Sequence, residues 1–381
     1  VVHNSDFIAQ RQDARLINQL LDGLDMIDGL LSAANFRNLN ATFTLFFEIQ
    51  PLLEQLLALY ACDDEIPCQV VQVMESASRY LDISSLSDDE NMVRFSRGFR
   101  GLLQQYQKSS SNLQTPQPGN DIESLSKIRT LISSISYLVH NEMGFASDES
   151  SPSIDRAVSD DYGKTEVFGL YCVYITTNSS QLLAPNVLRI LMQLISEMVQ
   201  YRIPSLLRWL PANIWGQMLN TLLAGIDHDI YDIGQRTYEA ISKLGAYVKV
   251  VGVGSVSDDL HSVFNQGFKQ LLSKLLRALL FSTFDMELVE SAGSALVTLG
   301  LLDPGHFQSC FHELFAQAET AAFAERLSAT LAKFNADLES SDGVKQLLES
   351  TKPIPDPIDG AILRQPLFEF LVNTRAVLRI K

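Results

Sequence analysis

The chain has 381 residues, and 46% of them are hydrophobic, so it is long and apolar enough to bury a sizeable core. Its formal net charge is −16, from 45 acidic and 29 basic residues. Such an acidic chain is a poor nucleic-acid binder, because phosphate contacts need lysine and arginine. It should instead attract basic proteins and be repelled by anionic membranes.

The cysteine and hydropathy patterns favour an intracellular protein that does not insert into a membrane. No two cysteines form a C-x-x-C pair, and buried reduced thiols are typical of the cytosol or the nucleus. No apolar run reaches the length of about 18 residues that would suggest a membrane-spanning helix, and no signal peptide is visible. The four cysteines are Cys62, Cys68, Cys172 and Cys310.

Apolar residues recur with a helical period along most of the chain, which predicts an all-α protein of about thirteen helices without a convincing strand. In chain order the predicted helices span residues 13–33, 42–60, 65–81, 91–107, 122–139, 167–175, 186–201, 212–224, 230–244, 258–281, 304–314, 321–334 and 365–378. Polar segments near 109–120, 144–161 and 351–360 are predicted loops. Asp303 and Pro304 form the N-cap and first position of one helix.

Residues 205–245 form a complete predicted helical hairpin, and its second helix recurs later in the chain. An offset of 55 residues aligns residues 229–245 with residues 284–300, so that Ala240 matches Ala295 and Gly245 matches Gly300. Gly245 is a predicted C-cap. Recurrence of one hairpin is typical of an α-solenoid, in which neighbouring repeats must stack to bury their apolar faces.

The sequence carries no local signature of an active site, and we expect no catalytic residue, no bound metal and no cofactor. The segment from Asp227 to Asp229, with Asp232, offers carboxylates and one imidazole that could hold a metal. A capping loop between two helices explains the same residues, and no second histidine or cysteine lies nearby. A non-enzymatic binding protein is therefore the favoured class.

Acidic residues recur at helical spacing and at equivalent positions of the two aligned helices. If these positions stack in a solenoid, they form a continuous anionic groove suited to a basic protein; separate solvated helix faces are the alternative. The aligned pairs are Asp232 with Glu287, Gln235 with Glu290, and Glu239 with Ser294. The candidate cargo-binding residues are Asp22, Asp25, Asp28, Asp232, Gln235, Glu239, Glu287 and Glu290.

About the last 215 residues resemble, in the order of their segments, the C-terminal region of exportins, which are nuclear transport receptors of the importin-β superfamily. The similar segments include VFGLYCVYITT, APNVLRILMQLISEMVQY, ESAGSALVTLGLLDPGHFQSCFHELF, AERLSATLAKFNADL and the terminal PLFEFLVNTRAVLRIK. The resemblance implies HEAT-type antiparallel hairpins stacked in a right-handed superhelical arch. The chain begins at Val1 without an initiator methionine, so we expect residues 1–381 to be the C-terminal segment of a larger receptor.

The resemblance also implies partners and a location. Receptors of this family bind protein cargo together with the GTP-bound Ran GTPase, contact nuclear pore proteins, and shuttle between nucleus and cytoplasm. Their cargo includes the hypusine-containing translation factor and transcription regulators. The full-length receptor, rather than this segment alone, is expected to bind Ran. A generic HEAT-repeat scaffold or adaptor that never visits the nuclear pore is the alternative function.

Overall fold

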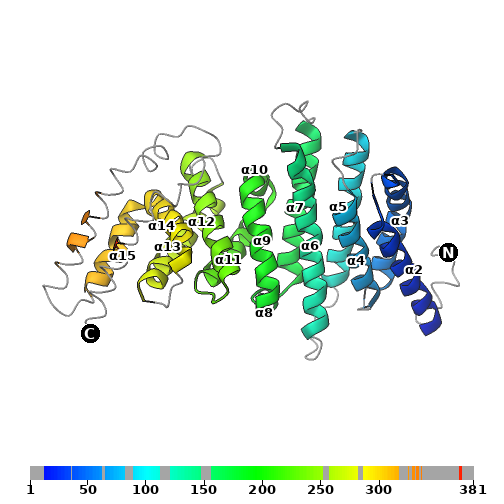
Figure 1. Cartoon of the computed structure of the whole chain (residues 1–381), viewed down its shortest axis with the longest axis horizontal. Helices are drawn as coiled ribbons and strands as arrows, with labels where there is room; N and C mark the ends of the chain where they lie inside the picture. Colours follow the sequence, from blue (N-terminus) through cyan, green and yellow to red (C-terminus); the bar gives the residue numbers. More distant parts are fainter. Residues whose placement is uncertain are drawn as a thin grey trace. The chain divides into compact units, whose positions relative to one another are not determined.

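The computed structural model describes residues 13–35, 37–61, 65–81, 89–111, 121–146, 156–251, 257–281 and 286–316, and isolated residues between 325 and 370 (Figure 1). Within these ranges the protein is helical and has no strand, so the all-α prediction is confirmed. None of the described helices is long and apolar enough to cross a membrane. The elements are α2 (Ala14–Ser32), α3 (Leu39–Leu59), α4 (Glu65–Tyr80), α5 (Asp89–Ser111), α6 (Asp121–Ala146), α7 (Arg156–Thr176), α8 (Ser179–Leu182), α9 (Pro185–Tyr201), α10 (Ile203–Trp209), α11 (Ala212–Ile226), α12 (Tyr231–Val251), α13 (Asp258–Phe281), the 3₁₀ helix η3 (Met286–Leu288), α14 (Val289–Leu302) and α15 (Pro304–Ala316).

Helices α5, α6 and α7 extend into two segments that were predicted to be loops. Helix α5 continues through Ser111, α6 through Ala146, and α7 begins at Arg156. Residues 112–120 and 147–155 lie outside the described residues, as does the predicted loop at 351–360. Most of the predicted helices at 321–334 and 365–378 also lie outside them.

The prediction that Gly245 ends a helix is wrong, because α12 continues six residues further, to Val251. The structure gives Gly245 another role. A β-carbon at this position would lie 2.7 Å from Thr298 Cγ2, so the glycine lets α12 and α14 approach closely. Its aligned partner Gly300 also lies within a helix, where a β-carbon would meet the Phe307 ring at 3.3 Å.

The chain divides into two compact units, the first formed by residues 1–194 and 204–210 and the second by residues 195–203 and 211–381. In the first unit α2, α4 and α6 pack in one row, and α3, α5 and α7 pack in another (Figure 1). Aromatic side chains link α3 to α5 in the second row, since the Phe95 ring lies 5.1 Å from the Phe46 ring and 5.9 Å from the Phe43 ring. Helices α2 to α7 therefore pack mainly against the next helix but one.

The second unit repeats this arrangement. Helix α12 packs along α14, while α11 packs along α13, which also contacts α15. The indole of Trp215 on α11 meets Phe264 on α13 edge to face at 4.9 Å, and both side chains are fully buried. Helix α13 has the predicted bounds because one of its faces is apolar throughout and the other carries exposed polar residues such as Asn265 and Gln270.

Candidate functional site

The predicted acidic stripe on α2 is turned partly toward α4. Asp22 and Asp25 are exposed, and the Asp25 carboxylate accepts a hydrogen bond from the Gln69 side chain on α4. Asp28 is half-buried, and one of its carboxylate oxygens is buried without a hydrogen-bond partner. These three residues therefore do not form a uniformly solvated acidic face.

Asp28 influences a second carboxyl group, that of Glu75 on α4. Burial raises the pKa of Glu75, and the negative charge of Asp28 raises it further, while the positive charges of Arg79 and Arg129 oppose both effects. The cluster of Asp28, Glu75, Arg79 and Arg129 joins α2, α4 and α6 within the first unit. No local pattern in the sequence indicates this cluster.

The predicted acidic residues of α12 lie on one side of that helix and interact with one another. Asp232, Gln235 and Glu239 are half-buried. The Gln235 amide donates a hydrogen bond to Glu239 Oε1 at 3.1 Å, and Arg236 Nη1 lies 3.9 Å from Glu239 Oε2. The Glu239 carboxylate is therefore oriented by two neighbours on its own helix.

Helices α12 and α14 pack in nearly the register that the repeat predicts. The hydroxyl groups of Ser242 and Ser294 lie 2.7 Å apart, and Lys249 Nζ donates to the Leu301 carbonyl at 2.7 Å. Facing residues are thus 52 positions apart in the chain, close to the repeat offset of 55. Equivalent residues of the two helices are therefore offset by three positions, about 4.5 Å along the helix axis.

The later acidic positions lie on η3 and at the start of α14. Glu287 on η3 is exposed, and Glu290 in the first turn of α14 is half-buried. Ser294, the predicted counterpart of Glu239, is buried between the two helices with 6% of its surface exposed. The aligned acidic positions are therefore not directly opposite one another, because in the observed register Glu287 corresponds to Gln235, and Ser294 corresponds to Ser242.

A cation lies at one end of this face. Lys243, one turn beyond Glu239 on α12, is half-buried, and its ammonium group donates to Gln200 Oε1 at 2.6 Å. Burial lowers the pKa of Lys243, the negative charge of Glu239 acts in the opposite direction, and the positive charge of Arg236 lowers it further. The face is mixed in charge, with its carboxylates toward the start of α12.

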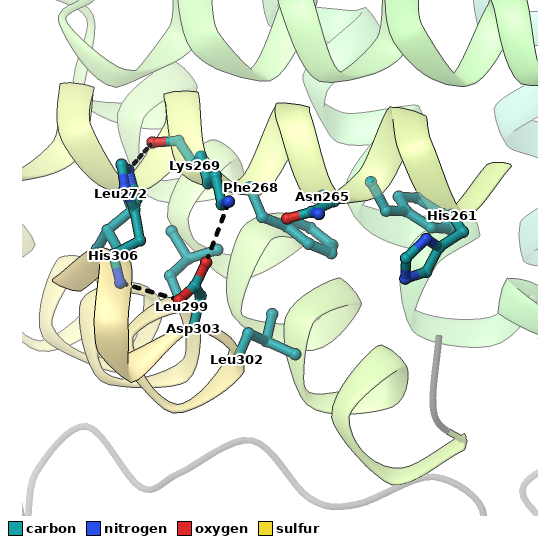
Figure 2. Close-up of a pocket in the computed structure, with 10 residues that line it drawn as sticks. His261, Asn265, Phe268, Lys269, Leu272, Leu299, Leu302, Asp303 and His306 are labelled. Carbon is teal, nitrogen blue, oxygen red and sulfur yellow. Dashed lines mark hydrogen bonds and ion pairs between the residues drawn. The ribbon is translucent and has the colours of Figure 1, made fainter. Parts of the chain in front are cut away.

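A pocket of about 180 Å³ lies between α13 and the α14–α15 junction, and sequence patterns did not predict it (Figure 2). Its lining residues are 27 or more positions apart between the two sides, so no local motif could reveal it. The α13 side contributes His261, Phe264, Asn265, Phe268, Lys269 and Leu272; the other side contributes Leu299, Leu302, Asp303 and His306.

The two sides of the pocket are held together by polar contacts (Figure 2). Asp303 Oδ1 accepts a hydrogen bond from the His306 backbone N–H at 2.9 Å, which confirms the predicted N-cap of α15. Lys269 Nζ lies 3.5 Å from Asp303 Oδ2. The His306 backbone contact, followed by the nearby Lys269 charge, holds the pKa of Asp303 below its usual range despite an opposing effect of burial.

His306, one of the two histidines that line the pocket, links α15 to α13 through its ring. Its Nε2 lies 3.2 Å from the Lys269 carbonyl, which can only accept, so the tautomer with a proton on Nε2 makes a hydrogen bond there. Cys310 Sγ lies 3.5 Å from the same nitrogen, and Ser273 Oγ lies 3.1 Å from it.

The sequence candidate for a metal site, residues 227–229 with Asp232, lies in the loop between α11 and α12 and in the first turn of α12. Asp227 pairs with Lys274 at 3.0 Å, and His228 Nδ1 accepts a hydrogen bond from the Ile230 N–H at 3.1 Å just before α12. Among the described residues, no group of three or more histidine, cysteine or carboxylate side chains is arranged to hold a metal ion.

Comparison of the sequence with protein-family models and with curated proteins gives no match.

Proposed function

We propose that the chain is a HEAT-type α-solenoid segment of a nuclear transport receptor and binds a basic protein cargo on the α12–α14 face. The observation that carries this proposal is the packing of helices α2 to α7, and of α11 to α14, against the next helix but one. Ala240 and its aligned partner Ala295 are both fully buried, as equivalent core positions of stacked repeats must be.

Support for a cargo surface comes from the charges on the outer side of these two helices. Asp232, Glu239, Glu287 and Glu290 are exposed or half-buried, and all four lie in the second unit, on α12, η3 and the first turn of α14. A cluster of like charges raises the local concentration of a ligand of opposite charge and speeds its association. Arg236 and Lys243 reduce this potential at one end, so the face favours a basic group over the start of α12.

The class of receptor is proposed from the resemblance of the last 215 or so residues to exportin-four, a member of the importin-β superfamily. On this proposal the segment binds cargo as part of a full-length receptor, in a cycle that depends on Ran-GTP and carries cargo from nucleus to cytoplasm through the nuclear pore. The hypusine-containing translation factor is the cargo with which to test it.

The test measures binding of that translation factor to the full-length receptor with Ran-GTP. One variant replaces Asp232, Glu239, Glu287 and Glu290 with lysine, and a control replaces four exposed acids elsewhere, Glu48, Asp259, Glu313 and Glu325, with lysine. Both variants change the net charge equally. We expect about a tenfold or greater loss of affinity in the first variant only, and a smaller difference in high salt, because the Debye length falls from about 8 Å to about 3 Å between 0.15 and 1 M.

Equal losses in both variants would mean that net charge alone attracts the cargo, and unchanged binding in both would reject the face altogether. If the protein is instead a generic scaffold, its partner binding should not depend on Ran. The full-length protein would then bind its partner equally well with Ran-GTP, with Ran-GDP and without Ran, and this result would separate a scaffold from a transport receptor.

A further inference from the structure

We propose that the pocket between α13 and the α14–α15 junction binds a small apolar α-amino acid in its zwitterionic form. This site is separate from the acidic face, and the inference does not depend on the proposed transport function. Three features of the pocket carry it: the size and apolar floor, the paired charges at the mouth, and the additional donors along α13 (Figure 2).

The volume of the pocket restricts the ligand to the size of a single amino acid. Pockets for drug-sized ligands occupy roughly 300–1,000 Å³, whereas this one has about 180 Å³. Its floor is continuous with the core, since the Phe264 and Phe268 rings stack 5.5 Å apart and Leu272 and Leu299 are almost fully buried. A branched or aromatic side chain would remove its apolar surface from water there.

The mouth of the pocket presents one cation and one anion side by side. Lys269 Nζ and Asp303 Oδ2 are 3.5 Å apart, beyond ordinary hydrogen-bonding distance, and their side chains are 43% and 38% exposed. Such a loose, hydrated ion pair contributes little by itself. The Lys269 side chain can therefore turn to a ligand carboxylate, and Asp303 Oδ2 is then left to accept from the ligand's ammonium group.

This charge arrangement distinguishes a zwitterion from a ligand with a single charge. A plain carboxylate would compete with Asp303 for Lys269 and meet its negative charge, and a plain amine would meet the Lys269 ammonium group. Asp303 is held in place for this role, because its other oxygen already caps α15 through the His306 N–H at 2.9 Å. A positioned carboxylate loses little conformational entropy when it binds.

Two more donors extend along the same line of α13. His261 and Asn265 precede Lys269 by eight and four residues, so all three project from one side of the helix. Both are exposed and line the pocket, where Figure 2 shows them on the side of the mouth away from His306. Asn265, one turn from Lys269, can donate to the ligand carboxylate beside Lys269, and His261 lies one further turn along the helix. Since the His306 ring is engaged with the Lys269 carbonyl, the chemistry expected here is binding without turnover.

Isothermal titration calorimetry of the whole chain with L-leucine and L-phenylalanine tests the proposal. N-acetyl-L-leucine, which lacks the ammonium charge, and L-leucinamide, which lacks the carboxylate, are the matched probes. We expect at least one free amino acid to bind and each blocked derivative of leucine to bind about tenfold or more weakly, because a site built around a polar group rejects analogues that lack it. Equal binding of N-acetyl-L-leucine and leucine would overturn the zwitterion assignment, as would no detectable binding of either amino acid at millimolar concentration.

The variants Lys269→Met and Asp303→Asn test the two charges separately. Methionine keeps the apolar stem, and asparagine is as good an N-cap as aspartate, so both proteins should fold with an unchanged circular dichroism spectrum. The control is Lys274→Met, because Lys274 lies on the same helix in an ion pair with Asp227 and does not line the pocket. We expect about tenfold weaker binding in the two pocket variants and unchanged binding in the control. Wild-type affinity in both pocket variants would refute the site.

Discussion

The side chains that carry charge in this protein are often half-buried between helices, and Glu75 on α4 is the clearest case. Burial raises its pKa, the Asp28 carboxylate raises it further, and Arg79 and Arg129 only partly compensate. The folded protein therefore retains this proton at pH values where the unfolded chain has released it. By linkage, the contribution of Glu75 to stability is largest below the ordinary pKa of 4.5 and is lost as the pH rises through the folded-state value.

Replacement of Glu75 with glutamine should remove this pH-dependent loss. We expect Glu75→Gln to melt at a higher temperature than the wild type at pH 7, and the difference to shrink as the pH falls toward 4.5. Thermal unfolding followed by circular dichroism between pH 4.5 and 7.5 checks this. Glu48→Gln, which changes an exposed glutamate on α3, is the control and should leave the melting temperature unchanged. A lower melting temperature for Glu75→Gln at pH 7 would show that the arginine contacts dominate.

Residue-level prediction from the sequence succeeds where the determinants are local. Asp303 followed by Pro304 identifies the start of α15, because both residues act within the first turn. The partners of Asp28 and the contacts of His306 with Lys269 join residues 37 or more positions apart. No periodicity or motif encodes such pairs, so the stripe on α2 was predicted as a surface feature and the pocket was not predicted.

At the scale of elements, the packing of α12 on α14 depends on small residues that bring the two backbones together. Gly245 faces Thr298, whose side chain is almost fully buried and whose hydroxyl donates to the Ser294 carbonyl at 2.7 Å. A β-branched side chain held in this way has little freedom to turn aside. The same change, glycine to alanine, should therefore have opposite effects at Gly245 and at a glycine with open space around it.

We expect Gly245→Ala to destabilise the protein by about 1–3 kcal/mol, since the new methyl group overpacks the interface. Gly216, inside α11, has open space where a β-carbon would lie, with no neighbouring atom within 4 Å, so Gly216→Ala should stabilise the helix by about 0.5–1 kcal/mol. Urea denaturation of the two variants measures both free energies of unfolding. Stabilisation by both substitutions would contradict the close approach at Gly245.

The bounds of the helices were predictable to the extent that the apolar period itself marks them. Helix α13 was predicted correctly because its apolar face runs unbroken from end to end. Helix α5 extends into a serine-rich run that resembles a loop, because Ser109 donates to the Leu57 carbonyl of α3 at 2.6 Å. The C-cap prediction for Gly245 was wrong since the role of this residue is set by α14, about 50 residues away in the chain.

At the scale of the whole molecule, the two compact units should not unfold as one. Each compact unit has its own core and contacts, so the two units can unfold at different denaturant concentrations. The two tryptophans report on different units, because Trp209 belongs to the first and Trp215 to the second. Trp215 is fully buried, whereas Trp209 is 38% exposed and lies against Lys164 and Arg208.

Single-tryptophan variants can separate the two transitions. We expect Trp215→Phe, which leaves Trp209 as the reporter, and Trp209→Phe, which leaves Trp215, to give different midpoints of fluorescence-detected unfolding in guanidinium chloride. Circular dichroism in the far ultraviolet should show a broader transition that covers both in each variant. Coincident midpoints by all probes would mean that the chain unfolds in a single two-state step.

The packing of each helix against the next but one has a consequence during synthesis on the ribosome. The side of α12 that packs against α14 stays uncovered until α14 has been synthesised. The aligned positions of the two helices are 55 residues apart in the chain. At about 5–20 residues per second this interval lasts roughly 3–11 s, whereas local helical structure forms in microseconds to milliseconds. Every nascent hairpin thus exposes one apolar side for seconds, and the rate of translation, rather than the rate of folding, sets how long a chaperone can engage it.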